Sequence, residues 1–163
     1  MPQSSLQIVE FGPVRAIGMA MRGLPGKSDF AGFWQKGFGS RMGEIQHPKG
    51  CMMFGVCRCI PGATDGTFEY VAMMEATADA PVPAGMVEIV LPRCTYAAFA
   101  VESYAKFHEA WVGSREALLG QKEWKKFCGP DGCECATHPA FEYYPPDSYK
   151  TGKAWVYKPV RKG

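Results

Sequence analysis

Glu142 is an acidic residue in a run of aromatic ones, because Phe141 precedes it and Tyr143 and Tyr144 follow. Side chains alternate along an extended strand, so Glu142 and Tyr144 share one face and Phe141 and Tyr143 share the other. A carboxylate enclosed by rings is unfavourably desolvated unless a positive charge pairs with it. The rings themselves attract a cation by about 0.5–2 kcal/mol each. The pattern predicts a site for a cationic ligand; the alternative is a solvated strand residue opposite a lysine.

Glu69 has the same aromatic neighbours, in the triplet Phe68-Glu69-Tyr70. Two carboxylates facing one groove would raise each other's pKa, and one of them could then serve as a general acid or base. An exposed charge at a sheet edge is the alternative. The other candidates for the wall of a binding site are aromatic, and each could equally pack in the core: Tyr96, Tyr144, Trp34 and Trp111.

Soft metal ligands cluster in a different part of the chain. Cys128, Cys133, Cys135 and His138 form the pattern C-x4-C-x-C-x2-H in a segment with no clear periodicity. Such ligands could close a tetrahedral zinc site and order a loop that has few apolar residues, although this spacing is uncommon. We therefore expect no cofactor other than zinc at this loop. For the pair Cys57 and Cys59, which share one face of a predicted strand, packing is the expected role.

The elements that must hold these residues occur in a repeating order. Strands are predicted at 6–10 and 14–21, a helix from Asp29 towards Ile45, and strands at 51–60 and 67–76. After a proline-rich connector come strands at 86–91 and 94–101, a helix at 106–119, and strands at 140–144 and 154–160. The order β-β-α-β-β thus occurs twice.

The repeated order predicts an α+β fold within a single domain, 1–163. We expect a first repeat at about 5–79 and a second at about 85–161, related by pseudo-twofold symmetry. The triplets Phe68-Glu69-Tyr70 and Phe141-Glu142-Tyr143 are interpreted as echoes of this duplication. An antiparallel sheet would carry two helices on one face and a shared ligand groove on the other, and a seam between halves is a common place for a ligand.

Composition excludes several classes of function. The 163 residues are 47% hydrophobic and 21% charged, which excludes extensive disorder. The net charge of +2, with no dense basic stripe, argues against direct nucleic-acid binding. Neither a membrane span nor a signal peptide is evident, so we expect a cytoplasmic protein. Neither a catalytic triad nor a glycine-rich phosphate loop before a helix is present.

Several segments together resemble the GyrI-like small-molecule-binding domain, which is the effector-binding domain of AraC-type and MerR-type multidrug regulators. The most specific are PAFEYY at 139–144 and YAAF at 96–99. The others are 68–76, 82–92, 154–160 and the helix that contains Trp111. Their order and spacing carry the resemblance over nearly the whole chain.

The resemblance implies a duplicated α+β fold whose central cleft binds cationic, lipophilic aromatic compounds, with Glu142 as the counter-charge. The absence of a helix-turn-helix segment suggests a stand-alone member, which would need a separate partner for transcription regulation. The cysteine-rich segment before Glu142 departs from the family pattern. Two alternatives stay open. One is a hydrolase of strained, cyclopropanoid-type electrophiles that uses Glu142 and Tyr96, although binding without catalysis is favoured. The other is a protein-interaction role such as binding a topoisomerase, which the family's naming member suggests.

Overall fold

The computed structural model describes residues 6–24, 27–48, 50–126 and 138–162. The strands in these ranges are β1 (Gln7–Phe11), β2 (Val14–Gly23), β3 (Met53–Cys59), β4 (Phe68–Glu75), β5 (Val87–Leu91), β6 (Cys94–Val101), β7 (Trp124–Lys126), β8 (Ala140–Tyr144) and β9 (Ala154–Lys162). The helices are α1 (Phe30–Gly32), which continues as a π-helix over Phe33–Phe38, α2 (Phe107–Leu119) and α3 (Ser148–Thr151). Single 3-10 turns lie at Met42–Glu44 and Tyr104–Lys106.

All the paired strands run antiparallel, in the order β1-β6-β9-β8-β3-β4-β2-β5, with β7 added to β9. The central pair joins β3 of the first half to β8 of the second. Outward from this pair, the order β3-β4-β2 on one side matches β8-β9-β6 on the other. Each half also lends its first strand to the far edge of the other half, since β1 lies on β6 and β5 on β2. The predicted α+β antiparallel fold is confirmed, whereas the repeat boundaries stay a prediction.

The two aromatic triplets do not mark equivalent positions in the two halves. Phe68-Glu69-Tyr70 lies on β4, whereas Phe141-Glu142-Tyr143 lies on β8, and the strand that corresponds to β8 in the sheet order is β3. The interpretation of Glu69 as the symmetric counterpart of Glu142 is therefore wrong. The resemblance between the triplets is therefore local, and aromatic residues such as those in both triplets are common in strands.

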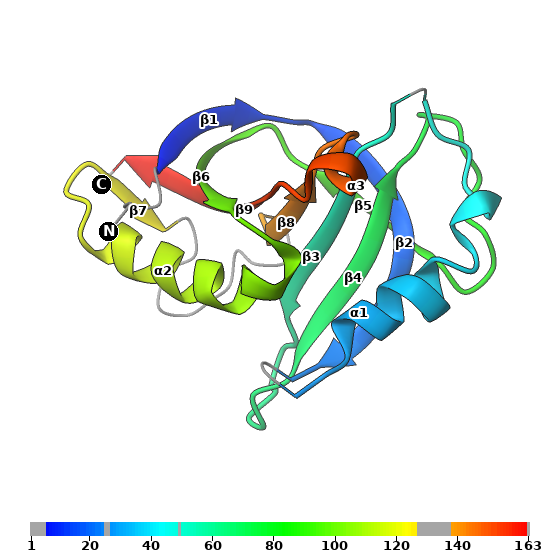
Figure 1. Ribbon diagram of the computed structural model, residues 1–163, viewed down its shortest axis with the longest axis horizontal. Helices are drawn as coiled ribbons and strands as arrows, with labels where there is room; N and C mark the ends of the chain where they lie inside the picture. Colours follow the sequence, from blue (N-terminus) through cyan, green and yellow to red (C-terminus); the bar gives the residue numbers. More distant parts are fainter. Residues whose placement is uncertain (1–5, 25–26, 49, 127–137, 163) are drawn as a thin grey trace.

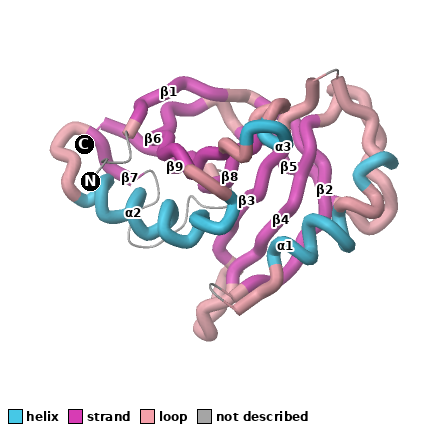
Figure 2. Tube along the Cα trace, in the orientation of Figure 1, coloured by secondary structure: helices cyan, strands magenta, loops and turns pink. Residues whose placement is uncertain are grey.

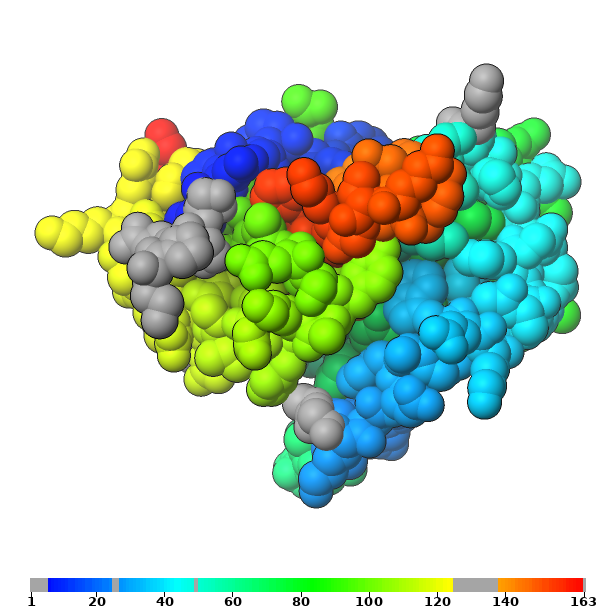
Figure 3. Space-filling view, viewed as in Figure 1, coloured from blue at the N-terminus to red at the C-terminus, as the bar shows by residue number. Residues whose placement is uncertain are grey.

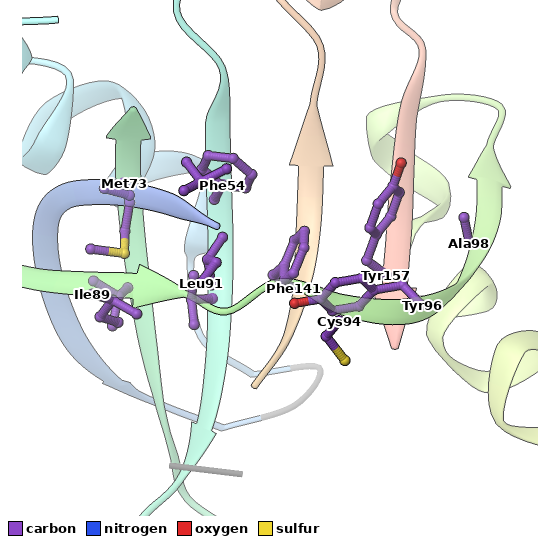
Figure 4. Close-up of a cluster of buried hydrophobic side chains, with 13 residues drawn as sticks. Phe54, Met73, Ile89, Leu91, Cys94, Tyr96, Ala98, Phe141 and Tyr157 are labelled. Carbon is purple, nitrogen blue, oxygen red and sulfur yellow. The ribbon is translucent and has the colours of Figure 1, made fainter. Parts of the chain in front are cut away.

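The sheet curls on itself, and its inner face holds the largest core (Figure 1). Side chains from several strands meet there, and Figure 4 shows Phe54, Phe141, Tyr96 and Tyr157 pointing towards one another. The rings of Tyr96 and Phe141 are fully buried, with centroids 5.3 Å apart in an edge-to-face arrangement. Such packing excludes water and a ligand from the inner face.

Both long helical segments cover the outer face (Figures 1 and 2). The α1 segment packs through Phe38 on Ile17 and Ala72, while α2 packs through Leu118 in a cluster with Phe99 and Val156. Helices on one face of the sheet are confirmed. The groove, however, does not lie on the opposite face, because the curl fills that face with the core. It lies between the two helices, where Figure 3 shows a recess with strand atoms at its base.

The first helix is shorter and wider than its periodicity predicts. Asp29 caps its start, since its side chain accepts a hydrogen bond from the Gly32 amide at 2.9 Å. The last turn then widens, with the Gly39 amide donating to the Trp34 carbonyl oxygen five residues back at 2.7 Å. Such π-type turns often occur at functional sites. No helix within the described ranges has both the length and the apolar character needed to cross a membrane.

Candidate functional site

The recess between α1 and α2 is a cleft of about 550 Å³. Aromatic residues dominate its lining: Phe30, Phe68, Tyr70, Phe107 and Trp111. A second cavity of about 410 Å³ shares Phe30, Tyr70 and Phe107 with it and adds Trp34 and Tyr144. Glu142 lines both cavities, so its carboxylate lies where the two spaces meet.

Glu142 occupies the middle of β8, next to the centre of the sheet. Its Cα partners are Gly55 on β3 and Val156 on β9, and its side chain is only 8% exposed. Gly55 is needed here because of a close approach. A Cβ at this position would lie 2.4 Å from both Glu142 Oε1 and the hydroxyl oxygen of Tyr70. The missing side chain makes room for the carboxylate on the floor of the cleft.

Three neutral aromatic donors hold the Glu142 carboxylate. The Tyr70 hydroxyl donates to Oε1 at 2.6 Å, and the Tyr144 hydroxyl donates to the same oxygen at 3.0 Å. The indole of Trp111 donates to Oε2 at 3.3 Å. The Trp34 indole extends the network by donating to the Tyr70 hydroxyl oxygen at 2.7 Å. Donors from α2, β4 and β8 therefore converge on one carboxylate, and the α1 segment joins the network through Trp34 and Tyr70.

The electrostatics of this network are those of a desolvated acid. Burial raises the pKa of Glu142, and the hydrogen bonds from Tyr70, Trp111 and Tyr144 oppose that rise without cancelling it. Burial and the nearby Glu142 charge raise the pKa of Tyr70 and of Tyr144 well above the ordinary value. Both hydroxyls therefore stay protonated and donate. In the described part of the chain, the ion pairs involve other carboxylates.

Four of the residues selected from the sequence meet in this site: Glu142, Tyr144, Trp34 and Trp111. The Trp34 and Tyr144 rings are in edge-to-face contact, with centroids 5.3 Å apart. Tyr70 was not among the predicted site residues, although its hydrogen bond to Glu142 is the shortest of the three. The sequence did contain one indication of its orientation. Alternation within Phe68-Glu69-Tyr70 places Tyr70 on the face of the strand opposite Glu69.

Two selected residues lie elsewhere. The expectation that Tyr96 lines the cleft is wrong, because its ring is buried in the inner core and its hydroxyl donates to the Pro92 carbonyl oxygen at 3.0 Å. Glu69 also points away from the cleft and forms an ion pair with Arg58, its cross-strand neighbour. The two carboxylates do not share a groove, so they do not form an acid–base pair.

Of the seven cysteines, one lines the cleft, three lie elsewhere among the described residues, and three fall outside the described residues. Cys57 lines the cleft, and burial together with the Glu142 charge raises the pKa of its thiol well above the ordinary value. The predicted zinc ligands Cys128, Cys133 and Cys135 lie outside the described residues, and only His138 lies inside them. Among the described residues, no group of three His, Cys, Asp or Glu side chains could hold a metal. The zinc site stays a prediction.

Comparison with solved structures finds the same fold in proteins of low sequence identity. An integron cassette protein from the mobile metagenome of Vibrio cholerae is 16% identical, with 96% of this chain and 95% of that chain covered and a TM-score of 0.66. The structure of SAV2435 bound to tetraphenylphosphonium is 15% identical over 96% of this chain and 94% of that one, with a TM-score of 0.64. EcmrR, in a complex with DNA, is 11% identical over 98% of this chain and 58% of that one, with a TM-score of 0.68.

Sequence comparison agrees with the fold. No curated protein is similar enough to count as a match. The sequence model of the GyrI-like small molecule binding domain, however, matches residues 5–160, which include β1 to β8 and all of β9 except its last two residues. This chain therefore belongs to the family of GyrI-like small-molecule-binding domains.

Proposed function

We propose that the protein binds lipophilic, cationic aromatic molecules in the cleft between α1 and α2, with Glu142 as the counter-charge. The observation that carries this proposal is a nearly buried carboxylate that accepts hydrogen bonds from neutral aromatic donors at the base of a ring-lined cleft. Small-molecule binding follows from the family; the class of molecule and the role of Glu142 belong to the proposal.

The surroundings of Glu142 favour a positive ligand over a neutral one. Burial raises the pKa of the carboxylate despite its hydrogen bonds from neutral donors, so a cation that enters the cleft would stabilise the ionised form. The rings of Phe30, Phe107 and Trp111, which line the cleft, could add cation–π attraction. The tetraphenylphosphonium bound to SAV2435 is a ligand of this chemistry on the same fold.

Removing the charge while keeping the shape of Glu142 tests the proposal. Glu142→Gln should weaken tetraphenylphosphonium binding about ten- to hundredfold, because a desolvated ionic contact is worth about 1.5–3 kcal/mol. The affinity for the neutral triphenylphosphine oxide should change little. Isothermal titration calorimetry measures both ligands, and Glu69→Gln is the matched control on the other face of the sheet. Equal affinity of the wild type and Glu142→Gln for the cation would contradict the counter-charge role.

The short contact between Tyr70 and Glu142 favours a second candidate, hydrolysis of strained electrophilic rings, with Tyr70 in the place that sequence analysis gave to Tyr96. In such a step Glu142 would accept a proton from water as the water oxygen bonds to a ring carbon. The ring bond would break, its electron pair would move to a conjugated carbonyl oxygen of the substrate, and Tyr70 would protonate that oxygen. Incubation with a cyclopropane-bearing alkylator and mass spectrometry would detect a product heavier by one water. Reversible binding with no such product would exclude the enzyme.

A further inference from the structure

The cleft carries positive charge as well as the Glu142 carboxylate. Among the described residues that line it, Glu142 is the carboxylate, while Arg115 and Lys158 are cations. Arg115 is exposed and Lys158 is half-buried. The charges therefore lie at different depths: the Glu142 carboxylate is on the floor of the cleft, and the positive charges of Arg115 and Lys158 are nearer to solvent. A cleft built only to attract monovalent cations would not need the two positive residues.

Trp111 separates the two kinds of charge. Its indole donates to Glu142 Oε2, and Lys158 Nζ lies 5.4 Å from the centroid of its ring. Arg115 follows Trp111 by four residues on α2, a spacing that places both on one side of the helix. The carboxylate and the cations thus flank a single ring, within reach of one aromatic ligand.

The charge of Lys158 acts electrostatically on Cys57, which also lines the cleft. It lowers the pKa of the Cys57 thiol, in opposition to burial and the Glu142 charge. A ligand with one positive charge would be attracted by Glu142 and repelled by Lys158 and Arg115. A ligand that also has an acidic group would be attracted at both positions, and the mixed charge of the cleft would then favour it over the monocation.

We propose that the cleft selects amphoteric aromatic ligands, with the cationic part at Glu142 and an acidic substituent at Arg115 and Lys158. This inference rests on the proposed function and narrows it to a ligand class. Surface ion pairs are individually weak, so the selectivity should come from both cations together and should fall as salt is added.

Rhodamine B and its ethyl ester test the inference, since they share one cationic ring system and differ by a carboxylate against an ester. Fluorescence anisotropy gives the affinity of each dye for the wild type, Arg115→Gln/Lys158→Gln and Glu142→Gln. We expect the wild type to prefer rhodamine B about fivefold and the double variant to lose that preference. Lys150→Gln is the matched control, because Lys150 also stacks on a ring, with its Nζ 5.5 Å from the Tyr149 centroid, but does not line this cleft.

The outcomes separate the two proposals. If Glu142→Gln weakens both dyes but the ratio of their affinities is the same in the wild type and the double variant, the amphoteric selectivity is wrong and the counter-charge role stands. If neither dye binds, or Glu142→Gln changes neither affinity, the proposed function fails and this inference fails with it.

Discussion

Gly55 is the position where the smallest change should damage the site most. In Gly55→Ala the new methyl group would lie 2.4 Å from Glu142 Oε1 and from the Tyr70 hydroxyl oxygen, and 2.9 Å from Tyr70 Cζ. These distances are far inside van der Waals contact, so the Tyr70 hydroxyl and the Glu142 carboxylate would have to shift towards the cleft that both residues line. The carboxylate and the hydroxyl would have to separate.

The expected loss of stability follows from two effects. Inserting a methyl group into closely packed contacts costs about 1–3 kcal/mol. A hydrogen bond to a charged group contributes about 1.5–3 kcal/mol, and the 2.6 Å contact between Tyr70 and Glu142 is the one at risk. Partial relaxation makes the two effects overlap, so we expect Gly55→Ala to lower the free energy of unfolding by about 2–4 kcal/mol.

Urea denaturation and tetraphenylphosphonium titration together measure this effect. Affinity should fall about tenfold or more, because the charge moves from its position. Gly113→Ala is the control: a Cβ there meets nothing within 4 Å, and it lies within α2, where alanine should stabilise the helix by about 0.5–1 kcal/mol. If Gly55→Ala has the same free energy of unfolding and the same tetraphenylphosphonium affinity as the wild type, the close packing around the carboxylate is refuted.

Two further predictions concern the same network. The folded-state pKa of Glu142 is raised above its unfolded value, so its contribution to stability is fully present below the unfolded pKa and is lost as pH rises through the folded pKa. Urea unfolding from about pH 4 upward should therefore show a decline that Glu142→Gln removes, and an identical decline in both proteins would refute the assignment. Tyr70→Phe should destabilise the fold by about 1.5–3 kcal/mol and weaken cation binding. Tyr96→Phe, which loses a bond to a neutral carbonyl, should cost about 1 kcal/mol with binding intact.

The order of the elements was predictable because each long strand has a clear alternation and each helix a clear period. The elements that escaped prediction are short. The strand Trp124–Lys126 has three residues, too few to show a period, and the helix Ser148–Thr151 has four. The sequence did not predict on which face of the sheet the groove lies, for a different reason. Alternation divides a strand into two faces, but only the curl of the whole sheet decides which face is filled.

The correct and wrong site residues differ in what fixes their orientation. Glu142 and Tyr144 lie on one strand, so alternation alone places them together. Tyr96 lies on β6, which is separated from β8 by β9. The face to which Tyr96 points, relative to Glu142, therefore depends on the register of both pairings. Val156 is opposite both Glu142 and Phe99, so Phe99 shares the Glu142 face, and Tyr96, three residues before Phe99, points to the other. A single sequence contains no register, and Tyr96 could not be oriented without one.

The same registers explain why the site needs both halves of the chain. Gly55, Tyr70 and Trp34 come from the first half, whereas Glu142, Tyr144 and Trp111 come from the second. Gly55 is the Cα partner of Glu142 across the central β3–β8 pair, and Tyr70 reaches the carboxylate from β4 over that glycine. Neither half alone holds both the acid and its strongest donor. The carboxylate is therefore desolvated only where the halves join, and a ligand bound to it would contact helical segments of both halves at once.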